Sequence, residues 1–307
     1  MVRVFIDGSA GTTGLRIRER LSARRDVELI GLTDAQRKET EARRDALNRA
    51  DVAFLCLPDA AAVEAAAMIE NDRTAVIDTS TAHRTAPGWV YGFPEVGGLR
   101  EAIGRSKRIA NPGCHASGFI ALVAPLVRAG LLDAEAQLCC FSLTGYSGGG
   151  KKMIAEYEAQ GRDRLLDAPR QYGLTQQHKH LPEMSAVSGL KEPPCFCPIV
   201  ADFYSGMEVT VPLFASQLRG TVQQICELYR EAYAGPVVRF AQDGGEGGFL
   251  SAAALSGRDG MEISVSGNGA RILLTARYDN LGKGASGAAI QNLNLLLGTD
   301  ETEGLIL

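Results

Sequence analysis

The N-terminal part of the sequence alternates between short apolar stretches and longer stretches with helical patterning. The apolar stretches that look like buried strands are residues 2–6, 27–32, 52–57, 75–78 and 108–111. The helical stretches are residues 15–25, 35–50, 60–70 and 116–129. Short strands that alternate with helices are typical of parallel βαβ units. The sequence therefore predicts an α/β domain built on a parallel sheet at this end of the chain.

The sequence changes character in its second half. Longer strand-like runs appear at residues 138–145, 203–215 and 270–279, with a helical stretch at 221–234 between them. This mixture predicts an α+β domain around a mainly antiparallel sheet. We expect a loop at the Pro- and Cys-rich residues 193–198, and a last helix at 285–297 with one strongly apolar face.

Composition narrows the class of protein. A length of 307 residues suits two domains of about 150 residues each. A net charge of −4 and 6% aromatic residues argue against nucleic acid as a partner. The longest apolar run, residues 119–127, is far shorter than the roughly 20 residues that cross a bilayer. Arg3 and Asp7 interrupt the first apolar stretch, so we expect no secretion signal, no membrane partner and a cytoplasmic location.

A glycine-rich segment joins the first predicted strand to the first predicted helix. It consists of Gly8, Ser9, Ala10, Gly11, Thr12, Thr13 and Gly14. Gly8 permits a tight turn, Gly11 lets the backbone approach a pyrophosphate, and Gly14 allows the helix to pack closely. The free N–H groups at the helix start attract an anion. The placement favours dinucleotide binding over an ordinary glycine-rich turn, although the spacing differs from the commonest fingerprint.

The residues after the second predicted strand leave the cofactor open. Asp34 lies about 20 residues beyond Gly14, where an acid would bind the ribose 2′-hydroxyl of NAD. Arg37 and Lys38 follow and would instead hold the 2′-phosphate of NADP. A charged, solvated helix start explains each of these side chains equally well.

One cysteine stands out from the seven in the chain. Cys114 follows Asn111-Pro112-Gly113 at the start of a predicted helix, where the partial positive charge favours the nucleophilic thiolate. Cys56, Cys139, Cys140 and Cys226 lie in apolar runs and are interpreted as small buried hydrophobic residues. Cys195 and Cys197 have no second pair nearby, so we expect no zinc site and no bound metal. An odd number of scattered cysteines indicates reduced thiols.

A cysteine nucleophile usually needs an acid/base partner, and the chain has four histidines. They are His83, His115, His178 and His180. The segment His178-Lys179-His180-Leu181-Pro182-Glu183 is the strongest candidate. If it is extended, its two histidines project to opposite faces, so one of them meets Cys114. His115 follows Cys114 directly and is expected to point elsewhere.

Taken together, these motifs resemble the N-acetyl-gamma-glutamyl-phosphate reductases, in their shorter form, over nearly the whole chain. The resemblance is carried by residues 8–14, 78–84, 91–95, 111–118, 146–152, 178–183 and 279–298. The order and joint presence of these motifs are more specific than any one of them. The family often has an aromatic residue, a small residue and a threonine after the nucleophilic cysteine, whereas this chain has His115, Ala116 and Ser117.

The resemblance implies roles for particular residues. Cys114 would be the nucleophile and His180 the acid/base, with His178 as the alternate. Further residues implied to bind the cofactor are Ser80, Asn280, Gly282 and Lys283. The residues implied to bind the substrate are Asn111, Ser147, Gly148, Gly149, Lys151, His178 and Glu183.

The resemblance also implies a fold and a reaction. The fold would be a Rossmann-type dinucleotide-binding domain of residues 1–115 and 284–307, and a catalytic and oligomerisation domain of residues 116–283. The reaction would be NADPH-dependent reduction of N-acetyl-glutamyl 5-phosphate, in arginine biosynthesis, through a cysteine thioester that releases inorganic phosphate. A homodimer or homotetramer is implied. The alternatives are an aspartate-semialdehyde dehydrogenase, a reductase of a carrier-bound amino-adipyl phosphate, and an NADP-binding regulator without activity.

Overall fold

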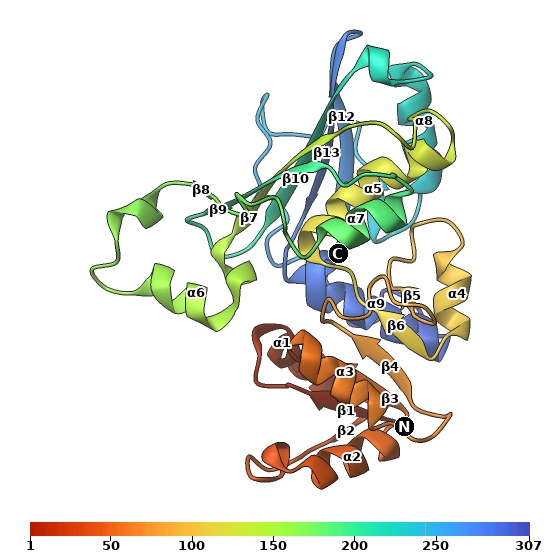
Figure 1. The fold of residues 1–307 in the computed structure, drawn as a ribbon, viewed down its shortest axis with the longest axis vertical. Helices are drawn as coiled ribbons and strands as arrows, with labels where there is room; N and C mark the ends of the chain where they lie inside the picture. The colour runs from red at the N-terminus through yellow and green to blue at the C-terminus, as the bar shows by residue number, and fades with distance from the viewer. Residues whose placement is uncertain (243) are drawn as a thin grey trace. The chain divides into compact units, whose positions relative to one another are not determined.

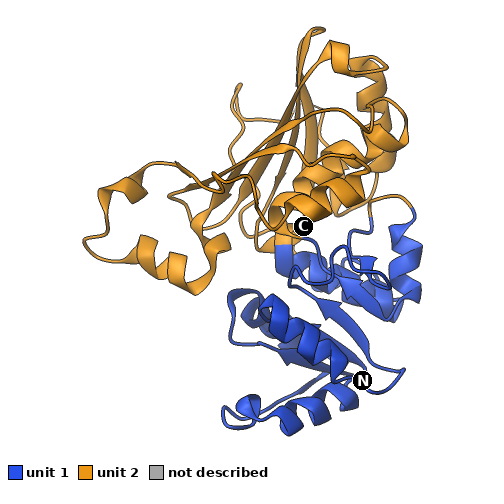
Figure 2. Cartoon of the chain, in the orientation of Figure 1, with its two compact units in different colours: residues 1–94, 98–112, 285–305 blue, residues 95–97, 113–284, 306–307 orange. Residues whose placement is uncertain are grey.

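The computed structural model describes residues 1–242 and 244–307. The chain divides into two compact units (Figure 2). Unit 1 comprises residues 1–94, 98–112 and 285–305, and unit 2 comprises residues 95–97, 113–284 and 306–307. Both units are therefore built from segments that are far apart in the sequence.

Unit 1 contains a six-stranded parallel sheet in the order β2-β1-β3-β4-β6-β5 (Figure 1). Its strands are β1 (Val2–Asp7), β2 (Val27–Ile30), β3 (Val52–Leu55), β4 (Ala75–Asp78), β5 (Val90–Tyr91) and β6 (Arg108–Ala110). The chain runs from β1 to β2 on one side and then returns to place β3 on the other side of β1. Ligands of open α/β sheets bind where the strand order reverses in this way, beyond the carboxyl ends of the strands.

Helices cover both faces of this sheet. They are α1 (Thr12–Ser22), a short turn η1 (Gln36–Lys38), α2 (Thr40–Arg49), α3 (Asp59–Ala67), α4 (Leu99–Arg105) and α9 (Gly287–Leu297). One core joins α1, α4 and α9 to the strands through Val4 and Ile6 of β1. The other joins α2 and α3 to the opposite face through Phe5. Alternate residues of β1 therefore serve two cores, as expected of a strand buried on both faces, and the predicted Rossmann-type sheet is confirmed.

Unit 2 contains a seven-stranded mixed sheet in the order β11-β12-β13-β10-β7-β9-β8. Its strands are β7 (Cys139–Gly145), β8 (Arg170–Gln171), β9 (Cys195–Ala201), β10 (Met207–Phe214), β11 (Val238–Phe240), β12 (Met261–Gly267) and β13 (Arg271–Tyr278). The pairs β11·β12 and β7·β9 are parallel and the others are antiparallel. The predicted mainly antiparallel sheet is confirmed.

Helices α5 (Cys114–Arg128), α7 (Leu181–Ser188) and α8 (Val222–Ala232) lie beside the sheet of unit 2 (Figure 1). Helix α5 is almost wholly buried and contacts α7, α8, β10 and β13. The segment between β7 and β8 carries α6 (Gly150–Glu158) and extends away from the sheet. Its Tyr157 and Leu166 form a small core with Val200 of β9.

The prediction of a loop at residues 193–198 is wrong. Strand β9 begins at Cys195 and pairs in parallel with β7 along its whole length. Pro198 has no N–H group, yet its carbonyl oxygen accepts from the Tyr172 N–H (3.0 Å). Local composition favours a loop here, but the neighbouring strand provides the pairing that decides the conformation.

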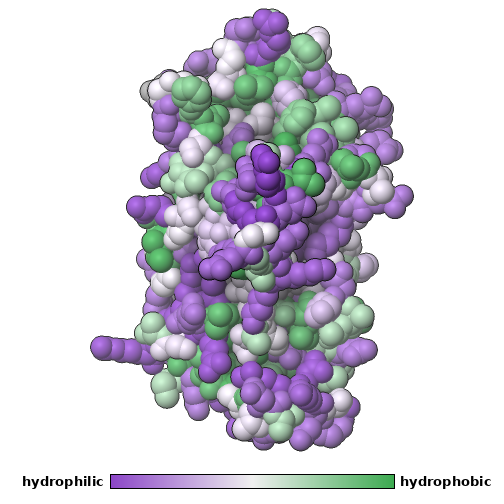
Figure 3. Space-filling model, turned by 90° about the vertical axis from the view of Figure 1, so that its left-hand side faces the viewer, coloured by the Kyte–Doolittle hydropathy of each residue, from purple (hydrophilic) through white to green (hydrophobic). Residues whose placement is uncertain are grey.

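Among the described residues, no helix combines the length and apolar character needed to cross a membrane. On the face of the molecule drawn in Figure 3, hydrophilic residues predominate and hydrophobic residues lie between them singly or in small groups. Single exposed hydrophobic residues are normal on folded proteins.

Two helical glycines provide a test of the packing around α5. A Cβ at Gly118 would lie 2.7 Å from Val209 Cγ2 and 2.8 Å from the Tyr278 hydroxyl oxygen, whereas the nearest atom to a Cβ at Gly104 of α4 is 3.6 Å away. We expect Gly118→Ala to lower the free energy of unfolding by about 1–3 kcal/mol through overpacking. Gly104→Ala, the matched control, should raise it by about 0.5 kcal/mol. Urea denaturation of both variants checks the signs, and an unchanged or more stable Gly118→Ala would contradict the packing described here.

Candidate active site

The glycine segment of unit 1 has the geometry of a phosphate-binding turn. Gly8 has φ +86°, and a Cβ there would lie 2.2 Å from the Cys56 carbonyl oxygen. A Cβ on Gly14 would lie 2.5 Å from the Gly8 carbonyl oxygen, so this glycine allows α1 to pack against the turn. A Cβ on Gly11, the residue before α1, would have the Gly8 carbonyl oxygen as its nearest neighbour, at 3.5 Å. Its open side leaves room for a ligand close to the backbone, so the segment fits a dinucleotide.

A cavity of about 410 Å³ adjoins this turn within unit 1. Gly8, Ser9 and Ala10 line it together with β1, β2 and the residues after β3. Three arginines also line it: Arg18 of α1, Arg37 of η1 and Arg43 of α2. A cavity beside a glycine turn with three guanidinium groups suits an anionic ligand.

The charged residues expected after the second strand lie in different surroundings. Asp34 is 95% exposed in its side chain and bonds to Arg37 at 3.1 Å. Neither Asp34 nor Lys38 is among the described residues that line the cavity, and Lys38 is exposed. Arg37 is therefore the one of the three that the structure brings to the cavity.

Arg43 is a cavity residue that the sequence analysis missed. Its guanidinium donates two hydrogen bonds to the Asp7 carboxylate, at 3.1 and 2.8 Å, and Asp7 is buried at the end of β1. A buried acid at the end of a strand needs a charged partner, and this is the signal that could have indicated a basic residue nearby. The sequence alone did not identify which arginine that is.

Two other expected ligand residues of unit 1 are held by side-chain hydrogen bonds. The Ser80 N–H and Oγ donate to the Asp78 carboxylate (2.9 and 2.7 Å), which is also 2.7 Å from His83 Nδ1. The Asn111 amide donates to the Ala285 carbonyl oxygen (3.0 Å) and accepts from α9. Both side chains are buried, and their contacts fix the segments that follow β4 and β6.

In unit 2, Cys114 is the first residue of α5, as the sequence predicts. Its side chain is partly exposed and its carbonyl oxygen accepts from the Tyr278 hydroxyl (2.5 Å). A Cβ on Gly284 would lie 3.0 Å from the Cys114 Cβ, so this glycine allows the chain to pass beside the cysteine. Free N–H groups in the first turn of a helix favour a thiolate over a thiol.

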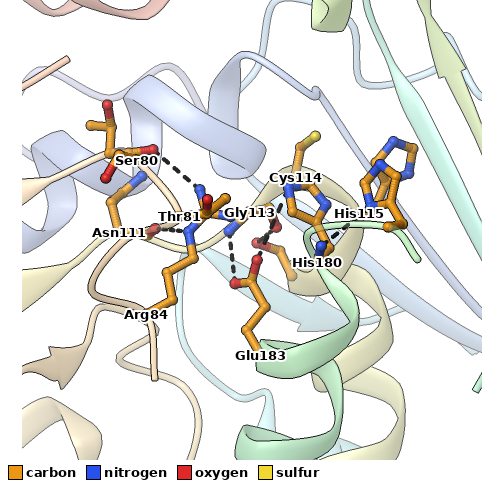
Figure 4. A network of polar contacts seen from close by, with 12 residues as sticks. Ser80, Thr81, Arg84, Asn111, Gly113, Cys114, His115, His180 and Glu183 are labelled. Atoms are coloured by element: carbon orange, nitrogen blue, oxygen red, sulfur yellow. Dashed lines mark hydrogen bonds and ion pairs between the residues drawn. The ribbon is translucent and has the colours of Figure 1, made fainter. Parts of the chain in front are cut away.

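Glu183 links the cysteine's helix to the histidine segment (Figure 4). Its carboxylate accepts from the Gly113 N–H at 3.1 Å, and its other oxygen lies 4.0 Å from His180 Nε2. Glu183 is 1% exposed and His180 is buried. A buried carboxylate beside an imidazole stabilises the protonated ring and fixes its orientation.

The expectation that His178 and His180 project to opposite faces is wrong. Their ring centroids are 4.8 Å apart, because the segment turns into α7 at this point. The His178 Nδ1 accepts from the His180 N–H (3.2 Å). Burial lowers the pKa of His178, with a smaller contribution from Lys179, so the neutral ring is favoured there.

His115 also belongs to this cluster, contrary to the expectation that it points elsewhere. Its ring centroid lies 5.7 Å from that of His178 and 5.6 Å from that of His180. Its two ring nitrogens lie 2.6 Å from the Ser142 hydroxyl and 2.6 Å from the Tyr172 hydroxyl. Burial lowers its pKa to about 3. Nothing in the sequence pattern signals the partners Ser142 and Tyr172, because both come from distant elements.

The Ser147 turn and the segment near Asn280 meet in unit 2. The Asn280 amide nitrogen donates to the Ser147 hydroxyl (3.0 Å), and its oxygen accepts from the Gly206 N–H (2.9 Å). A Cβ on Gly148 would lie 3.3 Å from the Asn280 amide nitrogen. Sequence reasoning placed Ser147 at the substrate and Asn280 at the cofactor, and the structure brings the two together.

The remaining expected site residues of unit 2 differ in exposure. Lys151, in the first turn of α6 after Gly149, is exposed. Lys283 is 1% exposed, and its ammonium bonds to both oxygens of Glu95 at 2.9 and 2.7 Å. A Cβ on Gly282 would lie 2.0 Å from the Arg258 carbonyl oxygen. The ion pair with Glu95 compensates the charge of the buried Lys283.

The cysteines outside the site differ from the sequence interpretation in part. Cys140 is buried as expected, Cys56 and Cys226 are partly buried, and Cys139 is exposed. Cys139 is exposed because it is the first residue of β7 and lies on the sheet face opposite α5. Among the described residues, no group of His, Cys, Asp and Glu has an arrangement that could hold a metal ion.

The family models that match this chain correspond to its two units. Residues 3–105 match the semialdehyde dehydrogenase NAD binding domain, and residues 114–280 match the semialdehyde dehydrogenase dimerisation domain. A protein named N-acetyl-gamma-glutamyl-phosphate reductase 2, from Nostoc sp., is 43% identical over 99% of both chains. One named N-acetyl-gamma-glutamyl-phosphate reductase, from Brucella anthropi, is 45% identical over 96% of this chain and 98% of its own. The chain belongs to the semialdehyde dehydrogenase family, among the N-acetyl-gamma-glutamyl-phosphate reductases.

Solved structures agree with the family's fold. An aspartate semialdehyde dehydrogenase from Francisella tularensis aligns with a TM-score of 0.71 over 97% of this chain and 100% of its own, at 14% identity. The Candida albicans aspartate semialdehyde dehydrogenase with NADP aligns with a TM-score of 0.66 over 97% and 99% of the two chains, at 15% identity. The relatives at 43–45% identity confirm the resemblance drawn from the sequence motifs, and the chain is an oxidoreductase.

The buried His115 predicts a pH dependence of stability. Its pKa is about 3 when folded and about 6.5 when unfolded. Between these values the unfolded chain binds one more proton than the native chain, so stability falls as the pH falls through this window. We expect the slope to be steeper than that of His115→Gln by up to about 1.4 kcal/mol per pH unit. Urea denaturation between pH 5 and pH 7 measures both slopes, and equal slopes would contradict a buried neutral ring.

Proposed function

We propose that this protein is an NADPH-dependent reductase that converts N-acetyl-glutamyl 5-phosphate to N-acetyl-glutamate 5-semialdehyde and inorganic phosphate, in arginine biosynthesis. The observation that carries the proposal is the Gly113–Glu183–His180 arrangement beside Cys114. The name shared by relatives at 43–45% identity supports the substrate. The order of chemical steps follows from the reactive groups present.

Cys114 carries the covalent step. Its thiolate attacks the acyl carbon of the substrate, the bond from that carbon to the phosphate oxygen breaks, and inorganic phosphate leaves with the electron pair. A thioester remains on the Cys114 sulfur. Because the sulfur lies at the start of α5, the helix N-terminus stabilises the negative charge on sulfur before attack and again when the sulfur leaves.

The glycine segment of residues 8–14 and the arginines of the adjoining cavity would hold NADPH, which would supply the hydride that reduces the thioester carbonyl carbon. His180 then donates a proton to the oxygen that becomes negative, and takes it back when the carbon–sulfur bond breaks and the aldehyde leaves. Glu183 stabilises the protonated imidazole from 4.0 Å. The Gly113 N–H is bonded to the same carboxylate, so Glu183 orients the histidine and the residue before the cysteine together.

The remaining site residues are assigned either to the substrate or to the cofactor. We assign substrate binding to Asn111, Ser147, Gly148, Gly149, Lys151, His178 and Glu183. We assign cofactor binding to residues 8–14, Arg37, Ser80, Asn280, Gly282 and Lys283, and not to Lys38, which is outside the cavity lining. To this second group the cavity adds Arg43 and Arg18. The dimerisation domain matched by residues 114–280 supports a homodimer or homotetramer, and we take unit 1 as the dinucleotide-binding domain and unit 2, which contains Cys114, as the catalytic domain.

The reverse reaction tests the proposed function. Purified protein is given NADP, inorganic phosphate and either N-acetyl-glutamate semialdehyde or aspartate semialdehyde, and reduction of NADP is followed by absorbance. We expect phosphate-dependent turnover with the first substrate, and a loss of at least about 10³-fold in Cys114→Ala because the covalent route is removed.

The controls separate the alternatives. Preference for aspartate semialdehyde would keep the mechanism and replace the substrate. Full turnover by Cys114→Ala would overturn the covalent mechanism, and activity with neither aldehyde would favour a carrier-bound substrate or a regulator. Cys226→Ala, which alters a partly buried cysteine of α8, is the matched control and should retain turnover.

The residues that line the cavity predict which side chain selects NADPH over NADH. Arg37 lines the cavity and Lys38 does not, so Arg37→Ala should lose a charged contact to the 2′-phosphate worth about 1.5–3 kcal/mol. We expect the ratio of kcat/KM for NADPH to that for NADH to fall about 10- to 100-fold in Arg37→Ala. Lys38→Ala serves as the neighbouring comparison and should change the ratio less. A larger fall in Lys38→Ala would reverse the assignment.

A further inference from the structure

Gln176 combines a strained backbone with a specific side-chain contact. Its φ is +55°, and among the described residues it is the one non-glycine residue with positive φ. It ends a turn in which its N–H donates to the Gly173 carbonyl oxygen (3.0 Å). Residues other than glycine rarely adopt this backbone conformation. Backbone strain of this kind is concentrated at functional sites.

The Gln176 side chain binds the backbone of β9. Its amide nitrogen donates to the Phe196 carbonyl oxygen (2.7 Å), and its amide oxygen accepts from the Phe196 N–H (2.8 Å). A primary amide can replace a backbone peptide group in such a pair because it has one donor side and one acceptor side. Gln176 thus occupies the position that a further residue of β8 would take.

The contact continues a ladder that begins in β8. Arg170 and Gln171 pair with Val200 and Ile199, and the Tyr172 N–H donates to the Pro198 carbonyl oxygen. The two hydrogen bonds between the Gln176 amide and the Phe196 backbone are the next contact along β9. Residues 170–176 therefore follow one edge of β9, and we name residues 172–180 the histidine loop.

Phe196 connects this contact to the histidines. Its ring centroid lies 5.3 Å from that of His115 and 5.1 Å from that of His178. His178 follows Gln176 by two residues, and its Nδ1 accepts from the His180 N–H. The Gln176 amide thus holds the backbone of the residue on which the His178 ring packs.

We propose that Gln176 is a positioning residue of the active site, whose side-chain amide holds the histidine loop on β9 and so sets the positions of the His178 and His180 rings. This inference rests on the proposed function for its kinetic consequence. Glycine would adopt φ +55° without strain, so the side chain, and not the backbone, is what this position uses.

The test separates positioning from stability. Gln176→Gly relieves the strain and removes both hydrogen bonds, so its thermal unfolding midpoint should stay close to that of the wild type. Its kcat/KM should fall on the order of 10- to 100-fold, because small displacements of catalytic groups carry such penalties. Gln176→Glu keeps an acceptor for the Phe196 N–H but places a carboxylate against the Phe196 carbonyl oxygen, and it should lose activity as well.

Gln177→Gly is the matched control, because Gln177 is the neighbouring glutamine and is exposed like Gln176. It should retain wild-type kinetics. A purely structural role would lower the unfolding midpoint and the fraction of active enzyme together, with kcat per reactive Cys114 unchanged. Positioning instead lowers kcat per reactive Cys114 and shifts the acid/base limb of the pH–rate profile. A Gln176→Gly enzyme within threefold of Gln177→Gly in kcat/KM would overturn the proposal.

A second readout does not depend on the substrate. The chain has four histidines, so their ring signals can be assigned by nuclear magnetic resonance with single His→Gln variants. We expect the His178 and His180 signals to move in Gln176→Gly and not in Gln177→Gly. If the wild type oxidises neither semialdehyde, the proposed function fails and this spectrum still decides the role of Gln176, which unmoved His178 and His180 signals would refute.

Discussion

The site in unit 2 depends on one buried carboxylate. Glu183 is 1% exposed, and a charge removed from water must be matched by hydrogen bonds or by an opposite charge. The Gly113 N–H bonds to one of its oxygens and His180 lies near the other. The start of α5 and the start of α7 are therefore fixed to the same group, and this places Cys114 and the histidines in one constellation.

In unit 1 the candidate binding site depends on backbone geometry. The Gly8 turn and the Gly14 contact require residues without a Cβ, and they leave Gly11 open at the start of α1. Charge is then supplied by arginines that line the adjacent cavity, among them Arg37 and Arg43. Because N–H groups at a helix start and guanidinium groups both attract phosphate, the unit is suited to a dinucleotide before any base-specific contact is considered.

Much of the fold and part of the site could be predicted from the sequence. Strand periodicity identified both sheets, and the start of α5 at Cys114 followed from local patterning. Residues 193–198 were wrongly predicted as a loop, because pairing with β7 outweighs the local preference for a turn. The contact between His178 and His180 escaped prediction because the segment turns into α7 instead of staying extended. The hydrogen bond between His115 and Tyr172 and the pairing of Arg43 with Asp7 escaped prediction because they join elements distant in the sequence.

The sequence by itself determined the alternation of strands and helices in unit 1, the glycines that permit the phosphate turn and the cysteine at a helix start. These depend on side-chain periodicity and on steric limits within a few residues. The tertiary structure alone decided which charges are paired, such as Lys283 with Glu95. It also decided that the rings of His115, His178 and His180 lie together. Such pairings join residues far apart in the chain, and they form because burial imposes a large penalty on an unpaired charge or polar group.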